Sequence, residues 1–376
     1  MQGVKLVSRS TRLPRHHYNS DVRHLVFIAF LGLVIFVEPT SVQPSKDGPT
    51  CNSPTAPTKQ HGIAFEHAWG RRATTHGYGT TASGNSLDQL QNLGVNWISV
   101  IPFGFQRAPS DTVIRWSASR FSKTDERLRA VAVQARERGI SVMLKPHVWL
   151  SPPAWVGMVS SKTESDWTAW FESYRRFILH YAALARDTGI EALCIGNELK
   201  GTTHREQEWR DLIAEIRDVY DGVLTYGAHA DEVWTLPFWD ALDYIGVSAY
   251  FELTDKPPPS RSEIVAGWEP HVARLEHLAS LWNRPVLFTE IGYRSVDFAA
   301  QYPWKFDDTT PVNLQLQADA YAAFFEAVWP KPWLAGAHWW KWRSSLDDRG
   351  VRKDDFTPRL KPAEKVLKQF YKATET

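Results

Sequence analysis

The sequence predicts a (β/α)8 TIM barrel, an α/β fold, on three observations. Short apolar segments alternate with helical patterns from residue 61 onward. Eight strand–helix units over roughly 315 residues suit this barrel, which usually needs about 250 residues plus insertions. An open doubly wound sheet is the structural alternative. No glycine-rich phosphate loop follows the first strand, which argues against the nucleotide-binding form of that sheet. The expected strands are 62–66, 95–101, 140–147, 192–198, 223–229, 244–250, 285–290 and 334–341.

Two segments precede the expected barrel domain, residues 61–376. A basic region leads into the apolar run 25–37, as in a secretory signal, and no clean small-x-small cleavage site follows. The run is shorter than the roughly 20 residues of a membrane span. We therefore predict that residues 1–37 are a signal peptide or an uncleaved signal anchor, which would tether the chain to a membrane. Residues 38–60 carry several prolines among polar residues and are predicted to be a linker. Either form of the signal predicts an exported protein: secreted, periplasmic, or membrane-anchored and facing outward.

Helices are predicted between the strands where their own patterns are strongest. Aromatic and aliphatic residues recur at helical spacing over 165–188. Thr203 and Glu206 have the spacing of a capping box, which predicts a helix over 204–220. Gly139 and Gly189 each follow a predicted helix and precede a strand, as C-terminal caps do.

Composition narrows the classes of partner. The 43 Lys and Arg residues nearly balance the 42 Asp and Glu residues, which argues against nucleic acid or an anionic membrane surface as the main partner. The chain has 18 Trp residues; most aromatic rings fill cores, but flat rings also stack on sugars. Cys51 and Cys194 are expected to be free thiols, since neither has metal or redox spacing.

Two glutamates end apolar strands that lie far apart in the sequence, Glu198 and Glu290. A charge at the end of a buried strand needs a compensating function or partner. Catalytic groups of such barrels sit at the carboxyl ends of the strands. Strand alternation places Ala192, Cys194 and Gly196 on the face of Glu198, and Val286 and Phe288 on the face of Glu290. We therefore predict that both carboxylates face one barrel interior, the pairing that glycosidic bond cleavage requires.

Other strand ends add polar and aromatic side chains suited to a sugar: Glu66, Lys145, His147, Tyr250 and the tryptophans of 339–342. Each has a structural alternative. Glu66 and Lys145 could form an ion pair, His147 could be a structural histidine, and about half of the tryptophans would pack against helices.

A metallohydrolase is the rival chemistry. His147, His229 and His338 with Glu66 or Asp231 could imitate such a site, but no H-x-H or H-E-x-x-H spacing occurs. We therefore expect neither a metal nor a cofactor.

An ordered set of segments over roughly residues 61–370 resembles glycoside hydrolase family 113, the β-mannanase-like group of (β/α)8 glycosidases with two catalytic glutamates. The segments are Gly94–Gln106, Val142–His147, Ile195–Glu198, Phe288–Ser295, Pro303-Trp304, Gly336–Trp342 and Lys361–Ala363.

The resemblance implies a retaining mechanism, with Glu198 as the acid/base and Glu290 as the nucleophile. It implies that Asn197 binds the sugar 2-hydroxyl, that Tyr250 orients Glu290, and that a strand-eight tryptophan floors the −1 subsite. The expected substrate contacts are Asn197, Tyr250, His147, Lys145, Glu66, Trp340, Trp342 and Tyr293.

The sequence therefore predicts a retaining endo-β-glycosidase, a monomer, that acts on a β-1,4-linked polysaccharide or oligosaccharide. The family's best-known substrate, β-1,4-mannan, is the expected one. The alternative is a carbohydrate-binding protein on the same barrel with little or no catalysis, because a fold alone does not guarantee activity.

Overall fold

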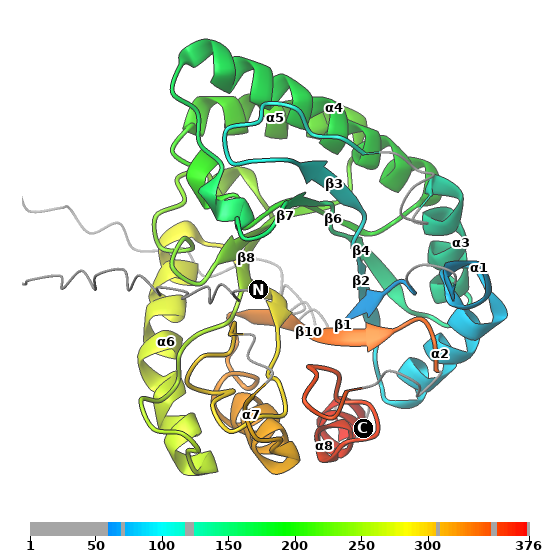
Figure 1. Ribbon diagram of the computed structural model, residues 1–376, viewed down its shortest axis with the longest axis vertical. Helices are drawn as coiled ribbons and strands as arrows, with labels where there is room; N and C mark the ends of the chain where they lie inside the picture. The colour runs from blue at the N-terminus through cyan, green and yellow to red at the C-terminus, as the bar shows by residue number, and fades with distance from the viewer. Residues whose placement is uncertain (1–58, 69–71, 117–123, 306–308, 347–351, 374–376) are drawn as a thin grey trace, which may run out of the picture. The chain divides into compact units, whose positions relative to one another are not determined.

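A closed parallel barrel forms the centre of the computed structural model, which describes residues 59–68, 72–116, 124–305, 309–346 and 352–373. Figure 1 shows the helices outside the ring of strands. The strand order around the barrel is β1-β10-β9-β8-β7-β6-β4-β2, so the predicted (β/α)8 barrel is confirmed and the open sheet is wrong. The barrel strands are β1 (Gln60–Glu66), β2 (Trp97–Val100), β4 (Ser141–Leu144), β6 (Ala192–Asn197), β7 (Val223–His229), β8 (Tyr244–Ser248), β9 (Val286–Ile291) and β10 (Leu334–Arg343).

Most helices lie between consecutive strands in the sequence, where a parallel pair needs a crossover connection. The bounds of the helices are α1 (Ala73–His76), α2 (Thr81–Asn92), α3 (Asp125–Arg136), α4 (Glu164–Thr188), α5 (Glu206–Val219), α6 (Arg261–Trp282), α7 (Leu314–Ala327) and α8 (Pro362–Ala373). Helix α8 follows β10, and only the 3₁₀ helix η4 (Trp239–Ala241) lies between β7 and β8. Gly189 ends α4 in the left-handed conformation, as predicted.

The predicted capping box at Thr203 is wrong. Helix α5 begins two residues later, after Arg205, and has no side-chain cap. The Thr203 hydroxyl donates instead to the Lys200 carbonyl at 3.1 Å, because the chain forms the short 3₁₀ helix η3 (Lys200–Thr202) here.

Two predicted strands continue past the barrel as a separate parallel pair, β3 (Phe103–Gln106) and β5 (His147–Leu150). Pro102 and Pro146 stand where β2 and β4 give way to this pair. Proline has no N–H for a ladder and so favours such interruptions. The pair carries Phe103, His147 and Trp149 above the carboxyl end of the barrel.

The barrel interior holds a small apolar cluster of its own. Met143, Ala192, Cys194 and Leu287 pack together there, fully buried, while the larger core fills the space between strands and helices. Cys194 is a free thiol, as predicted, and Cys51 lies outside the described residues.

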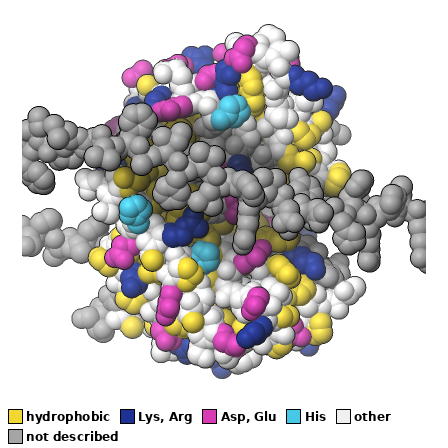
Figure 2. Space-filling view, turned by 90° about the vertical axis from the view of Figure 1, so that its left-hand side faces the viewer, with side chains coloured by type: hydrophobic (Ala, Val, Ile, Leu, Met, Phe, Trp, Pro, Cys, Tyr) yellow, Lys and Arg dark blue, Asp and Glu magenta, His cyan; other side chains and the backbone are white. Residues whose placement is uncertain are grey.

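The structure describes only the last residues of the predicted N-terminal segments. Residues 1–37 and nearly all of 38–60 lie outside the described residues, while β1 already begins at Gln60, the last residue assigned to the linker. Among the helices that the structure describes, none is long and apolar enough to cross a membrane. On the face in Figure 2, acidic and basic side chains are interspersed where the surface is described, in keeping with the balanced charge.

Candidate active site

A cavity of about 690 Å³ opens at the carboxyl ends of the barrel strands and brings most of the predicted site residues together. Its walls combine carboxylates, amines and aromatic rings, which is the composition expected of a sugar site. It is lined by Glu66, Ile101, Phe103, Lys145, His147, Trp149, Trp155, Asn197, Glu198, His229, Tyr250, Glu290, Trp304, Trp340, Lys341 and Phe356.

Glu290 is held by one donor on each carboxylate oxygen. The Lys145 ammonium donates to Oε2 at 2.7 Å, and the Tyr250 hydroxyl donates to Oε1 at 2.6 Å. Burial alone would raise the pKa of Glu290, but the charge and hydrogen bond of Lys145 and the Tyr250 hydroxyl lower it below its usual value. Glu290 is therefore kept ionised, as a nucleophile must be.

Glu198 has the opposite electrostatic environment. Burial and the charge of Glu290 raise its pKa, and the Trp155 indole N–H, which donates to Oε2 at 2.9 Å, only partly offsets this. A carboxyl that holds its proton beside an ionised one matches the division between general acid and nucleophile.

Surplus residues in β6 and β9, not simple alternation, turn the two glutamates into the cavity. Between Cys194 and Asn197 strand β6 advances three residues while β7 advances two. Between Leu287 and Glu290 strand β9 likewise advances three residues while β8 advances two. Such bulges change the direction of the side chains that follow them.

The predicted faces below the glutamates are therefore wrong. Phe288 packs against Trp268 and Phe324 on the helix side, and Leu287 points into the barrel in its place. A side chain at Gly196 would meet Tyr226 and Trp209, which belong to the outer core, so Gly196 does not share the face of Cys194. Both glutamates still face one cavity, because the bulges in β6 and β9 turn them there.

The chain reverses directly after β6, at Glu198 itself. Its backbone is left-handed, with φ of 53°, and its N–H donates to the Gly227 carbonyl at 2.8 Å. A non-glycine residue in this conformation costs roughly 1–2 kcal/mol. Such strain is retained where the surrounding structure requires it, often at functional sites.

Asn197 and His147 meet beside this turn. The Asn197 amide nitrogen lies 3.0 Å from His147 Nδ1, so His147 is positioned by the residue next to Glu198. Asn197 is 6% exposed, and its buried Oδ1 has no hydrogen-bond partner among the described residues. That oxygen lies against Gly227 of β7, so Asn197 is held between two strands at the cavity wall.

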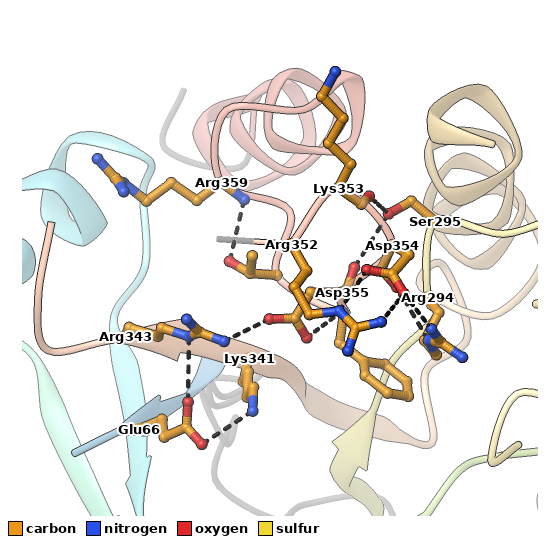
Figure 3. A network of polar contacts seen from close by, with 12 residues as sticks. Glu66, Arg294, Ser295, Lys341, Arg343, Arg352, Lys353, Asp354, Asp355 and Arg359 are labelled. Atoms are coloured by element: carbon orange, nitrogen blue, oxygen red, sulfur yellow. Dashed lines mark hydrogen bonds and ion pairs between the residues drawn. The ribbon is translucent and has the colours of Figure 1, made fainter. Parts of the chain in front are cut away.

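The Glu66–Lys145 ion pair suggested as an alternative is not formed, because Lys145 pairs with Glu290. Glu66 accepts instead from Lys341 at 3.0 Å and lies 3.5 Å from Arg343 (Figure 3). Arg343 in turn donates to Asp355 at 2.7 Å, in the segment that precedes α8. Glu66 and Lys341 thus line the cavity as a fixed ionic pair.

Two of the predicted sugar contacts are corrected. Trp342 is fully buried and its indole donates to Ser86 of α2 at 3.0 Å, so it packs between barrel and helices. Tyr293 is 1% exposed and lies against Trp339, which itself stacks on Tyr321 of α7 at 3.7 Å. Neither Trp342 nor Tyr293 lines the cavity. Trp340 is the tryptophan of β10 that does.

Several wall residues cannot be predicted from the sequence pattern. Trp149 and Trp155 lie in and after β5, where no periodicity indicates which ring turns toward the site. Trp304 belongs to a segment that resembled the family but was not named as a contact. These rings are 48%, 37% and 54% exposed, so they offer open faces at the rim.

A second cavity, of about 460 Å³, adjoins the first and shares His229, Tyr250 and Trp304 with it. Trp234, stacked under the Arg274 guanidinium at 3.8 Å, forms part of its wall. The cleft therefore continues beyond the two glutamates.

The histidines considered for a metal site are separated. His147 and His229 line the cavity, but His338 lies in the barrel interior, fully buried, with Nε2 2.8 Å from Gln60 Oε1. In the part of the chain that the structure describes, no group of three or more His, Cys, Asp or Glu side chains is placed to hold a metal ion.

A (β/α)8 barrel that ends in an aromatic cleft with two glutamates in opposite electrostatic environments defines a glycoside hydrolase. The chain belongs to glycoside hydrolase family 113, whose model matches residues 67–359.

Solved structures agree with this assignment. The family 113 β-mannanase AaManA from Alicyclobacillus acidocaldarius, in complex with ManMIm, is 30% identical, with a TM-score of 0.74 over 84% of this chain and 97% of that one. A family 113 β-1,4-mannanase is 28% identical, with a TM-score of 0.74 over 84% of this chain and 99% of that one.

A more distant likeness shows the fold alone. A β-glucuronidase from Faecalibacterium prausnitzii is 12% identical, with a TM-score of 0.56 over 85% of this chain and 49% of that one. No curated protein sequence matches the chain.

Proposed function

We propose that this glycoside hydrolase is a retaining endo-β-1,4-mannanase in which Glu290 is the nucleophile and Glu198 the acid/base. The observation that carries the proposal is the opposite shift of the two pKa values within one cavity, raised at Glu198 and lowered at Glu290. The family 113 β-mannanases that resemble the chain support mannan as the substrate.

In the first step, a Glu290 oxygen attacks the anomeric carbon while Glu198 gives its proton to the leaving glycosidic oxygen. This breaks the glycosidic bond and forms a glycosyl ester on Glu290. In the second step, Glu198 takes a proton from water, the water oxygen attacks the same carbon, and Glu290 leaves as a carboxylate. Two inversions give net retention.

The cleft walls support binding of a polysaccharide. Asn197 lines the cavity beside Glu198, within reach of a hydroxyl of the reacting sugar. Trp340, Trp149 and Trp304 offer rings for stacking. The second cavity beyond Tyr250 and His229 gives room for sugars outside the reacting one, which favours internal cleavage of a chain.

The deciding experiment measures new reducing ends on mannan, glucomannan, xylan, β-glucan and chitosan. Mannan and glucomannan should be cleaved to mixed oligosaccharides. Glu198→Gln and Glu290→Ala should each lower turnover by about 10³-fold, within the range of general acid and nucleophile losses. Glu191→Gln is the matched control, because Glu191 stands at the other end of β6 and accepts from the Val142 N–H at 2.8 Å.

Azide tests the two roles separately. It should rescue Glu290→Ala with an inverted glycosyl azide and Glu198→Ala with a retained one. Near-normal activity of either variant would contradict the assignment, and mannan binding without release of reducing ends would support the binding-protein alternative instead.

We also propose that the protein is exported, on the basic region and apolar run 25–37 of the sequence. Fractionation of cells that produce the full chain, with antibody detection, tests this; recovery only with the cytosolic fraction contradicts it.

A further inference from the structure

A second buried carboxyl lies behind the acid/base, and the proposed mechanism does not use it. Glu232, in the turn after β7, is fully buried. Among the described residues, no Lys, Arg or His side chain forms an ion pair with it. A buried carboxyl without a cationic partner is costly, so its retention calls for an explanation.

Glu232 is bound to the backbone on which Glu198 stands. The Tyr226 hydroxyl donates to Glu232 Oε1 at 2.7 Å, and the same hydroxyl accepts from the Leu199 N–H at 2.8 Å. Leu199 directly follows Glu198, whose backbone is left-handed. The chain Glu232–Tyr226–Leu199 therefore fixes the turn that aims Glu198.

Glu232 also reaches the side-chain partner of Glu198. The His229 N–H donates to Glu232 Oε2 at 3.0 Å, which holds the end of β7. The His229 ring packs edge-on against Trp155 with centroids 5.0 Å apart. Trp155 is the residue whose indole donates to Glu198.

We propose that Glu232 is a positioning residue for the acid/base: it fixes the Glu198 turn through Tyr226, and it supports Trp155 through His229. The proposal rests on the proposed role of Glu198 as the acid/base.

The groups that face Glu232 are Tyr226 and His229 of β7, Thr203 after η3, and Glu198 after β6. Burial raises the pKa of Glu232 to about 7, although the hydrogen bonds from Tyr226, His229 and Thr203 lower it; the charge of Glu198 raises it further. Two neighbouring carboxyls of this kind titrate as a pair.

The support through His229 bears on the pKa of Glu198. The Trp155 indole N–H lowers this pKa, so an indole that is held less firmly would leave Glu198 protonated to a higher pH. Proton donation to the leaving group needs this protonated form, and the basic limb of kcat/KM reports it.

The test is the pH profile of kcat/KM on mannooligosaccharide for Glu232→Gln, which keeps the shape and replaces one acceptor oxygen by a donor. The basic limb should move to higher pH, because the indole that lowers the pKa of Glu198 is then held less firmly. Trp155→Phe, which removes the indole hydrogen bond outright, should move the limb in the same direction and further. Glu191→Gln, the same substitution at the far end of β6, should leave the limb unmoved.

A second substrate separates positioning from general damage. An aryl β-mannoside with a dinitrophenol leaving group needs no proton for bond cleavage. Glu232→Gln should therefore lose at least fivefold in kcat/KM on mannooligosaccharide and less than twofold on the aryl mannoside. Equal losses on both substrates, or an unmoved basic limb, would overturn the proposal.

Two further variants keep the outcomes distinct. If Glu232→Gln does not fold, Tyr226→Phe, which keeps the ring against Gly196, should show the same selective loss on mannooligosaccharide. Glu198→Ala checks the underlying role: it must keep activity on the aryl mannoside while losing it on mannooligosaccharide. Equal losses of Glu198→Ala on both substrates would contradict the assignment of Glu198 as the acid/base. A selective loss of Glu198→Ala on mannooligosaccharide, together with an unmoved pH profile of Glu232→Gln, would contradict only the role of Glu232.

Discussion

Glu198 and Glu290 are the same residue type in one cavity, and their neighbours decide what each can do. Glu290 has a buried ammonium on one oxygen and a tyrosine hydroxyl on the other, while Glu198 has a single indole donor. Hydrogen bonds to a charged group each contribute about 1.5–3 kcal/mol. The asymmetry in donors therefore separates the proposed acid from the proposed nucleophile.

Tyr250→Phe tests this at the single-residue scale. Loss of the hydroxyl should lower kcat/KM about 10- to 100-fold, the equivalent of one hydrogen bond to a charge. Because that bond lowers the pKa of Glu290, its removal raises this pKa and moves the acidic limb of kcat/KM to higher pH.

The control is Tyr220→Phe, where the lost hydroxyl donates to the Ile190 carbonyl at the opposite end of the barrel. It should leave the acidic limb in place. An unmoved limb in Tyr250→Phe would show that Lys145 alone keeps Glu290 ionised.

Residue identity could be predicted from the sequence better than residue contacts. Glu198, Glu290 and Tyr250 end apolar strands, a position that strand patterns reveal. Lys145 is also identifiable, but the choice between Glu66 and Glu290 as its partner depends on how β4 lies relative to β1 and β9 across the barrel. The predicted sugar contacts of Trp342 and Tyr293 are wrong because an aromatic residue at a strand end can face either the cavity or the helices. Local bulges decide which of the two it faces.

At the scale of elements, the sequence pattern predicts the eight barrel strands to within a few residues. It does not predict the bulges in them. Period-2 reasoning assumes unbroken ladders, whereas β6, β9 and β10 each carry a surplus residue. The pair β3 and β5 was also missed, because Pro102 and Pro146 interrupt runs that read as single strands.

The segment before α8 is an element without regular structure that the site depends on. Arg294, 2% exposed, donates to Asp354 at 2.6 Å, and Ser295 and Lys361 bind the same stretch (Figure 3). This stretch carries Phe356 to the cavity wall, where its ring meets the edge of Tyr250.

Arg294→Met should therefore reduce the free energy of unfolding by about 3 kcal/mol, as removal of one partner from a buried ion pair does. It should also raise KM for mannooligosaccharide, because Phe356 loses its support. Urea unfolding and steady-state kinetics measure the two effects. Arg261→Met, which breaks an exposed pair with Glu326, should cost less than about 1 kcal/mol; an equal cost at both sites would show that the segment is not held by Arg294.

At the scale of the whole molecule, the barrel could be predicted because its evidence is repeated eight times along the chain. Errors in single strands do not change the count or the alternation with helices. The N-terminal predictions have no such redundancy, since each depends on one segment outside the described residues.

The buried His338 gives the whole barrel a pH dependence. Burial lowers its pKa to about 3, against an ordinary value of 6.5. The unfolded chain therefore takes up a proton below pH 6.5 that the folded barrel does not, so this group makes stability fall as pH drops from 6.5 toward 3.

Between pH 7 and pH 4.5 this loss should be on the order of 2 kcal/mol, and His338→Gln should remove it. Urea midpoints at both pH values for wild type, His338→Gln and the exposed control His277→Gln give the comparison. The same pH slope in His338→Gln as in wild type would contradict a neutral histidine in the barrel.

Because β6 and β9 each carry a surplus residue, the direction of the proposed catalytic side chains depends on the number of residues in each strand. Substitutions leave this number unchanged and so do not test it. Side-chain direction after each bulge depends on whether the preceding count is odd or even. Deleting one residue between Cys194 and Asn197, or between Leu287 and Glu290, would present that glutamate to the helices while hardly changing composition. A one-residue insertion or deletion in either strand should therefore abolish activity even though every wall residue is still present.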